Sequence, residues 1–160
     1  MKKAKSTRLP QSVTVRVPGS TSNCGAGFDT LGMAVALYNQ VVVRRAKAST
    51  PLAQPMRESD AAGQAMAEEA AKLFFARSGL TPFAFEFRIS GAVPMSRGLG
   101  SSVTLRAGIV AGLNELSGAA LAKPALATIV TALEGHPDNA TPAVLGGFCV
   151  GRCDPKTGEL

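Results

Sequence analysis

The sequence predicts an α+β fold, because strand-like and helix-like segments follow one another without the regular alternation of a doubly wound sheet. The clearest strand signal is the alternation of Phe83, Phe85, Phe87 and Ile89 with less apolar neighbours. The clearest helix signal is an apolar stripe at steps of four, four and three residues, formed by Leu105, Ile109, Leu113 and Leu116. The first periodicity is typical of a strand and the second of a helix, so the chain is expected to contain both kinds of element.

Length and composition favour one globular domain. The chain has 160 residues, of which 46% are hydrophobic and 18% charged. No apolar run is long enough to span a membrane, and the N-terminus lacks the apolar core of a signal peptide. A cytoplasmic protein with no membrane partner is therefore expected.

The net charge of +6 raises the question of nucleic-acid binding. Four of the positive charges lie in residues 1–11, which we expect to be a disordered basic leader before a domain at 12–160. The other basic residues are scattered, and aromatic residues make up only 5% of the chain. No nucleic-acid partner is expected.

The first half of the chain is predicted to be mainly strands. Residues 12–17 form a short strand that ends at Pro18-Gly19, and a polar loop follows at 20–29. Residues 31–46 are rich in β-branched and apolar side chains, which predicts one or two strands. Two prolines and mixed charge indicate a variable loop at 47–60.

A helix is predicted at 61–77, with its apolar face formed by Met66, Ala70, Leu73 and Phe74. Gly79 is placed to end it. The strand at 83–89 follows. Further helices are expected at 101–117 and 123–133, and then a strand at 147–154 and a turn at 155–158 that leads into a partner strand.

The helix at 101–117 carries a second face of small residues, formed by Ala107, Gly108, Ala111 and Gly112. Such a face lets a neighbouring element approach closely. The three cysteines cannot all pair with one another and show no metal-ligand spacing, so reduced thiols are expected. Cys24 is assigned to packing.

The loop before that helix is rich in glycine and serine, with Gly98 and Gly100 able to adopt conformations closed to other residues. Because the first N–H groups of a helix are unpaired, the loop is predicted to bind phosphate. A tight turn with a serine N-cap would use the same residue types. The loop is neither a Walker A motif nor a dinucleotide fingerprint. It comprises Pro94, Met95, Ser96, Arg97, Gly98, Leu99, Gly100, Ser101 and Ser102.

This loop resembles the second motif of the GHMP kinases, a family of small-molecule kinases. Residues 15–32 and 134–148 resemble the two substrate motifs of the homoserine kinases within that family. The resemblance covers roughly 12–153. It implies a GHMP kinase N-terminal domain of the ribosomal protein S5 domain 2-like type, with helices on one side of a mixed sheet.

The resemblance also implies an activity, the transfer of the γ-phosphate of ATP to L-homoserine, giving O-phospho-L-homoserine in threonine biosynthesis. The loop would bind ATP, with Arg97 either contacting phosphate or facing solvent. Ser102 and Glu134 would hold Mg2+, although in some members the glutamate lies further upstream, where this chain has Thr128.

By the same resemblance, the homoserine pocket is lined by Asn23, Asp29, His136, Asp138 and Asn139. For His136 the alternative is a structural hydrogen bond that fixes the turn at Pro137. No catalytic base is assigned.

The chain departs from the family pattern in two places. It has Val103-Thr104 where Ala-Ala is usual, which is expected to affect packing more than chemistry. The third glycine-rich motif and the C-terminal GHMP domain are absent, so the 160-residue chain is not expected to turn over homoserine. The oligomeric state is left open, with a homodimer as one alternative. A different GHMP kinase and a non-catalytic S5-like binding module are the rival functions.

Overall fold

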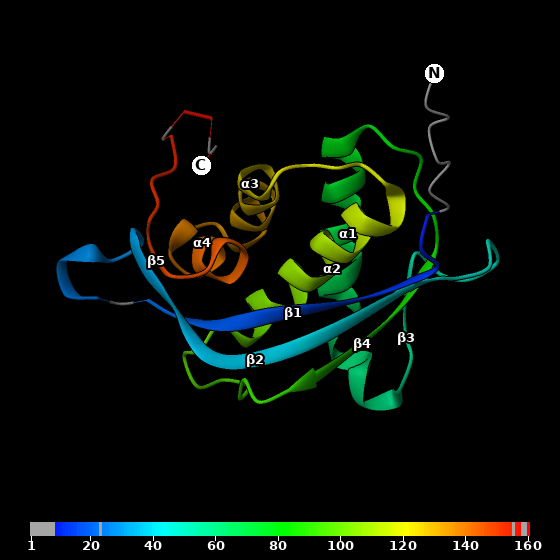
Figure 1. The fold of residues 1–160 in the computed structure, drawn as a ribbon, viewed down its shortest axis with the longest axis horizontal. Coiled ribbons are helices and arrows are strands. Elements are labelled where there is room, and N and C mark those ends of the chain that lie inside the picture. Colours follow the sequence, from blue (N-terminus) through cyan, green and yellow to red (C-terminus); the bar gives the residue numbers. More distant parts are fainter. Residues whose placement is uncertain (1–8, 23, 155, 158–159) are drawn as a thin grey trace, which may run out of the picture.

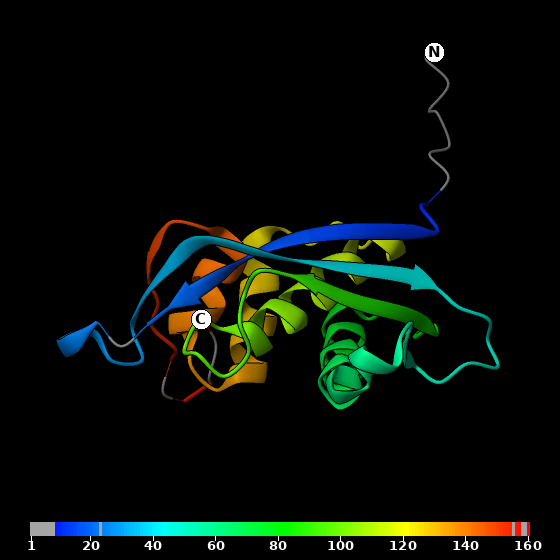
Figure 2. The same ribbon diagram turned by 90° about the horizontal axis from the view of Figure 1, so that it is seen from below.

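The computed structural model describes residues 9–22, 24–154, 156–157 and 160. A five-stranded sheet forms one layer, and the α-helices pack on one of its faces (Figure 1). The view from below shows the same two layers (Figure 2). The predicted α+β class is confirmed.

A long antiparallel hairpin organises the sheet. It pairs β1 (Ser12–Thr21) with β2 (Leu31–Arg45), with an irregularity between Pro18 and Gly19. The C-terminal half of β2 pairs antiparallel with β4 (Phe85–Gly91). The N-terminal end of β2 pairs with the short β5 (Phe148–Val150).

The strands differ from the sequence predictions mainly in length. The segment predicted as one or two strands is the single strand β2, and β5 is shorter than expected. The loop predicted at 47–60 contains a strand, β3 (Ala53–Pro55), which runs parallel to β4. Three residues that include a proline give no strand signal, so only the partner strand makes this segment β.

The predicted helices are confirmed with small shifts. A 3-10 helix, η2 (Glu58–Gly63), leads into α1 (Gln64–Ser78), and Gly79 ends it with a φ of 68°. The buried face of α1 is centred on Ala67, Ala70, Ala71 and Phe74, one residue further round than predicted. α2 (Ser101–Ser117) has the predicted bounds, and α3 (Lys123–Glu134) ends one residue later than expected.

One helix, α4 (Pro137–Leu145), was not predicted. It is short and contains Pro142, and prolines in such a short segment argue for a loop. Pro137 is compatible with the first turn, where the proline lacks only an N–H that would be unpaired. Packing against α3, β1 and β2 holds α4 in place.

The core lies between the sheet and α2. Its largest buried side chains include Val41, Val43, Phe85 and Phe87 from the sheet and Ile109, Leu113 and Leu116 from α2. The small-residue face of α2 was predicted to let a neighbouring element approach closely, and that element is β2. A Cβ at Gly108 would lie 2.4 Å from Val41, and one at Gly112 would lie 2.5 Å from Val43.

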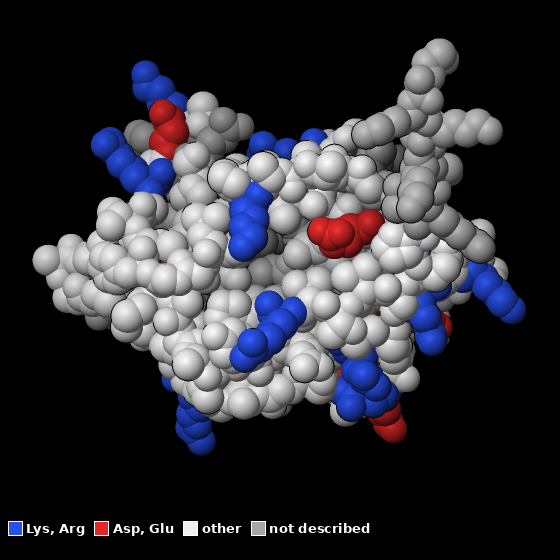
Figure 3. All heavy atoms as spheres, in the orientation of Figure 1, with Lys and Arg blue, Asp and Glu red and all other residues white. Residues whose placement is uncertain are grey.

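The other face of the sheet is exposed and polar. Its outward side chains include Thr14, Arg16, Gln40, Arg44 and Arg88. The basic side chains in Figure 3 are spread around the molecule, several of them beside acidic ones, without forming one patch on the face shown. Among the described residues, no helix is both long and apolar enough to cross a bilayer.

The N-terminal and C-terminal predictions fall partly outside the described residues. Residues 1–8 of the expected leader lie outside them, whereas the Gln11 carbonyl already accepts a hydrogen bond from the N–H of Arg45. Lys156 and Thr157 lie in a turn whose N–H groups donate to Asp154. The predicted partner strand beyond this turn lies outside the described part of the chain.

Candidate active site

A cavity of about 550 Å³ opens where four segments meet. They are the loop before α2, the η2–α1 corner, the end of β1 and the start of α4. Every residue of the predicted phosphate loop except Pro94 lines the cavity. Pro94 is exposed.

The loop turns into α2 through left-handed backbone conformations. Ser96, Gly98 and Gly100 have φ values of 56°, 71° and 65°. Gly100 also packs so closely that a Cβ there would lie 2.5 Å from the hydroxyl of Ser20. The N–H of Ser20 donates to the Leu99 carbonyl at 3.1 Å, so the end of β1 fixes the loop.

The first turn of α2 is tied to the sheet by buried polar groups. Asn39 donates from Nδ2 to the Thr104 hydroxyl at 2.8 Å and accepts from the N–H of Val93 at 3.2 Å. The Thr104 hydroxyl donates in turn to the Ser101 carbonyl at 2.7 Å. The threonine that departs from the family pattern is therefore a buried structural residue, as expected. Asn39 of β2 holds one end of the loop through Thr104 and the other through the N–H of Val93.

A second set of hydrogen bonds joins the end of β1 to α4. The Ser20 hydroxyl donates to Oδ1 of Asn139 at 3.0 Å, and Nδ2 of Asn139 donates to the Ser22 hydroxyl at 3.0 Å. Asn139 is thus placed at the cavity wall by two serines of the first motif. Asn23, the predicted neighbour of these serines, lies outside the described residues.

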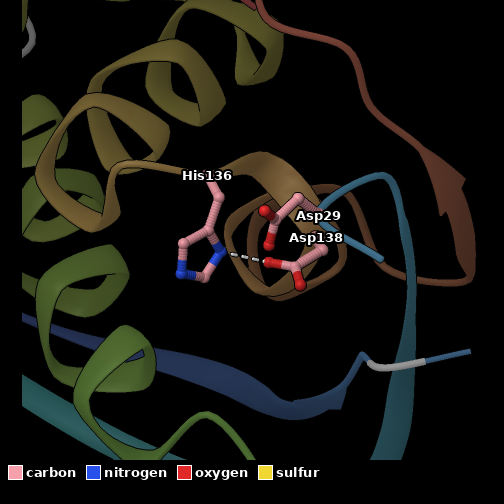
Figure 4. A group of neighbouring side chains, drawn as sticks. All are labelled: Asp29, His136 and Asp138. Atoms are coloured by element: carbon pink, nitrogen blue, oxygen red, sulfur yellow. Dashed lines mark hydrogen bonds and ion pairs between the residues drawn. The ribbon is translucent and has the colours of Figure 1, made fainter. Parts of the chain in front are cut away.

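Asp29, His136 and Asp138 come together beside the cavity, with ligand atoms all within 4.8 Å of one another. Their side chains point toward a common centre from the loop before β2 and from the start of α4 (Figure 4). Asp138 Oδ1 is hydrogen-bonded to Nδ1 of His136 and accepts the N–H of Asn139 at 2.8 Å. This proximity requires Gly32, because a Cβ there would lie 1.6 Å from the Asp138 carbonyl oxygen.

The predicted substrate residues differ in their access to the cavity. His136 and Asn139 line it, whereas Asp29 and Asp138 do not. Asp138 is 2% exposed, and Asp29 is exposed outside the cavity. The hydrogen bond to Asp138 shows that His136 has a structural role, and its place in the cavity wall also makes it available to a ligand.

The two predicted magnesium ligands, Ser102 and Glu134, line the same cavity, and Thr128 does not. Ser102 is exposed. The Glu134 carboxylate is 10% exposed and accepts a hydrogen bond from Nη1 of Arg106 at 2.6 Å. Burial lowers the pKa of Arg106, but its hydrogen bonds and charge interactions with Glu134 and Glu69 raise it by more.

The η2 side of the cavity was missed by sequence reasoning. Asp60 is 3% exposed and accepts two hydrogen bonds from Arg57, each at 3.0 Å. The hydrogen bonding that Arg57 donates to the Asp60 carboxylate is the main cause of the raised pKa of Arg57. Apolar side chains complete this wall, among them Met66, Ile89, Met95, Val103 and Leu105. They come from separate elements and form no local motif.

Three other residues of the site carry a signal in the sequence. Ser20 and Ser22 stand within the first motif, and Arg106 follows Ser102 by four residues, so it lies on the same helix face. One prediction is wrong: Cys24 is exposed rather than packed. All three cysteines are free thiols, as expected.

A comparison with known protein families identifies the family to which this chain belongs. Residues 65–147, more than half of the chain, match the model for the GHMP kinases N terminal domain. The chain belongs to the GHMP kinase family. The loop before α2 and the start of α4 are thus parts of a GHMP kinase N-terminal domain.

Named relatives of this GHMP kinase domain are homoserine kinases. A homoserine kinase of Prochlorococcus marinus (strain NATL2A) is 37% identical over 149 residues, covering 89% of this chain and 47% of the relative. A homoserine kinase of Moorella thermoacetica is 39% identical over 138 residues, and the match covers 84% of this chain and 46% of the relative. The chain therefore spans about half the length of the curated relatives it matches.

Among solved structures, the homoserine kinase from Cytophaga hutchinsonii matches with a TM-score of 0.78 and 22% identity. The match covers 94% of this chain and 51% of that one. At this identity the likeness concerns the fold, which agrees with the helices-on-one-face arrangement expected of the family.

Proposed function

We propose that the chain is the N-terminal part of a homoserine kinase, which transfers the γ-phosphate of ATP to the hydroxyl of L-homoserine. The observation that carries the proposal is that the glycine-rich loop and the start of α4 line one cavity. A phosphoryl-transfer enzyme must bring its donor and acceptor sites together in this way. The free cysteines are compatible with the reducing cytoplasm.

The loop would bind the phosphates of ATP. Its residues line the cavity at the N-terminal end of α2, where unpaired N–H groups and the helix dipole favour an anion. Arg97 is exposed in the same wall and can add a charge-assisted contact. The apolar side chains around Met66 and Ile89 offer a water-excluding surface for the adenine ring of ATP.

Ser102 and Glu134 fit a magnesium site, because the hydroxyl and the carboxylate that line this cavity are oxygen donors of the kind that Mg2+ prefers. Held by these residues, Mg2+ would neutralise part of the negative charge on the phosphates. Ser102 contributes from the first turn of α2, and Glu134 contributes from the last residue of α3.

The start of α4 would hold the amino-acid substrate. Asp29 and Asp138 concentrate negative charge beside the cavity, which suits an ammonium group. His136 and Asn139 offer hydrogen bonds from the cavity wall itself. Asn23 remains a prediction, and no side chain is assigned as a catalytic base.

The test is a two-dimensional NMR titration of the chain with a non-hydrolysable ATP analogue and then with L-homoserine. We expect the analogue to shift the amide signals of 95–102, and L-homoserine to shift those of the non-proline residues in 136–139. Mevalonate, which has a hydroxyl and a carboxylate but no ammonium, is the matched control and should leave 136–139 unchanged.

In the same titration, Asp138→Asn should weaken L-homoserine binding by about tenfold or more while sparing the analogue, because it removes the buried charge beside the pocket.

The titration also separates the rival functions. Binding of mevalonate in place of L-homoserine would favour another GHMP kinase. Salt-dependent RNA binding without any response to the analogue would favour the binding module and contradict the kinase.

A further inference from the structure

Arg106 links three helices behind the cavity. Its Nη1 donates to Oε1 of Glu134 on α3 at 2.6 Å, and its Nη2 donates to Oε2 of Glu69 on α1 at 3.2 Å. Arg106 follows Ser102 by one helical turn of α2, so the two proposed metal ligands and this arginine belong to one corner of the site.

We propose that Arg106 is a positioning residue that holds the Glu134 carboxylate ready for the divalent cation. The inference rests on the proposed function, in which Glu134 is a metal ligand. Arg106 engages Oε1, whereas Oε2 makes no hydrogen bond with any residue that the structure describes. Glu134 lines the cavity, and Arg106 does not. One oxygen is thus fixed by the protein and the other remains for a ligand.

The contact is poorly suited to a purely stabilising role. The side chains of Arg106 and Glu134 are 17% and 10% exposed, so both charges are largely withdrawn from water. Arg106 Nε is buried with no hydrogen-bond partner among the described residues. Buried ion pairs are weak evidence for stability, because apolar side chains of similar size often do as well. The arrangement holds Oε1 of Glu134 while it leaves Nε of the arginine without a hydrogen-bond partner among the described residues.

Glu69 explains how a cation can be held close to a positive arginine. Its carboxylate is 60% exposed and contacts Nη2 of the guanidinium, whereas Glu134 contacts Nη1. The three charges sum to −1, so the corner keeps a net attraction for a divalent cation. Metal-binding carboxylates are commonly oriented by such outer hydrogen bonds.

A positioning role and a merely repulsive role of Arg106 predict opposite changes in metal affinity when its charge is removed. If its charge merely repelled the cation, Arg106→Gln would tighten metal binding. If it positions Glu134, Arg106→Gln should weaken metal binding by about tenfold or more, the usual cost of losing an outer hydrogen-bond partner. Arg106→Lys keeps the charge but not the two-armed fork, and should fall between the two.

The experiment measures Mn2+ binding to the chain in the presence of ADP, from the electron paramagnetic resonance signal of free Mn2+. Arg44→Gln, which breaks the exposed pair of Arg44 with Glu86 on the outer sheet face, is the matched control and should leave Mn2+ affinity unchanged. Circular dichroism checks that each variant is folded, and the lysine variant tests the inference should the glutamine variant not fold.

Glu134→Gln separates the inference from the proposed function. Weaker Mn2+ binding in both Glu134→Gln and Arg106→Gln supports the inference. Weaker binding in Glu134→Gln with unchanged or tighter binding in Arg106→Gln overturns it and leaves Glu134 as a ligand. Unchanged binding in Glu134→Gln overturns the assignment of Glu134 and the inference together, while the phosphate loop remains testable through ADP alone.

Discussion

Single residues set the shape of the phosphate loop. Gly98 and Gly100 share a left-handed backbone but differ in their surroundings. A Cβ at Gly100 would collide with Ser20, whereas a Cβ at Gly98 would meet no atom within 4 Å. Gly98 is therefore free of protein contacts on the side where its side chain would be, and it can tolerate a close ligand.

Gly98→Ala should weaken binding of an ATP analogue by about tenfold or more, measured by calorimetry, because a methyl group intrudes where phosphate approaches the backbone. The strain of the left-handed conformation should cost about 1–2 kcal/mol of unfolding free energy. Gly79→Ala is the matched control, since Gly79 also has a positive φ and open space but lies at the end of α1.

Both variants should lose similar stability, and only Gly98→Ala should lose nucleotide affinity. Equal affinities in the two variants would remove the loop from the nucleotide site. The comparison isolates ligand access from backbone strain, because the strain is common to both positions.

At the scale of elements, α2 determines where the loop lies. Its glycine face fits against Val41 and Val43, and its first turn is fixed to β2 through Asn39 and Thr104. Asn39 also holds the N–H of Val93, just before the loop begins. Both ends of the loop are thus attached to the same side chain of β2.

Thr104→Val should lower the unfolding free energy by about 1–3 kcal/mol, because it leaves the buried Nδ2 of Asn39 without its acceptor. Thr128→Val on α3 is the matched control. The Thr128 hydroxyl donates to the Pro124 carbonyl at 3.1 Å but is exposed, so this change should cost no more than about 0.5 kcal/mol. Urea unfolding measures the free energy of unfolding of both variants. Equal losses would show that the hydrogen bond between Asn39 and Thr104 does not stabilise the fold.

At the scale of the whole molecule, one end of the sheet is unusually apolar for a surface. Phe28, Met33, Phe148 and Val150 are 66%, 43%, 61% and 70% exposed. They lie on the loop before β2, on β2 itself and on β5, and β2 and β5 pair directly. Exposed apolar patches mark surfaces that contact another structure.

The 160-residue chain should not turn over L-homoserine. It spans about half of the relatives' length, and a phosphoryl-transfer site needs protein on both sides of the substrate to exclude water and hold the carboxylate. A coupled assay of ADP release from the purified chain tests this. A turnover within tenfold of the roughly 1–100 per second typical of kinases would show that this half is sufficient.

The sequence by itself determined the features that depend on neighbouring residues. The strand at Phe85, the bounds of α2, its glycine face and the loop before it follow from spacing and from the backbone freedom of glycine. The family resemblance also follows from motifs that are contiguous in the chain.

Only the tertiary structure decided the contacts between distant segments. Ser20 and Asn139 are separated by 119 residues, Asn39 and Thr104 by 65, and Arg106 and Glu134 by 28. No local pattern records such pairs, because they depend on how the sheet and helices pack. For the same reason β3 and α4 were missed: each has weak intrinsic propensity and is held by the elements packed against it.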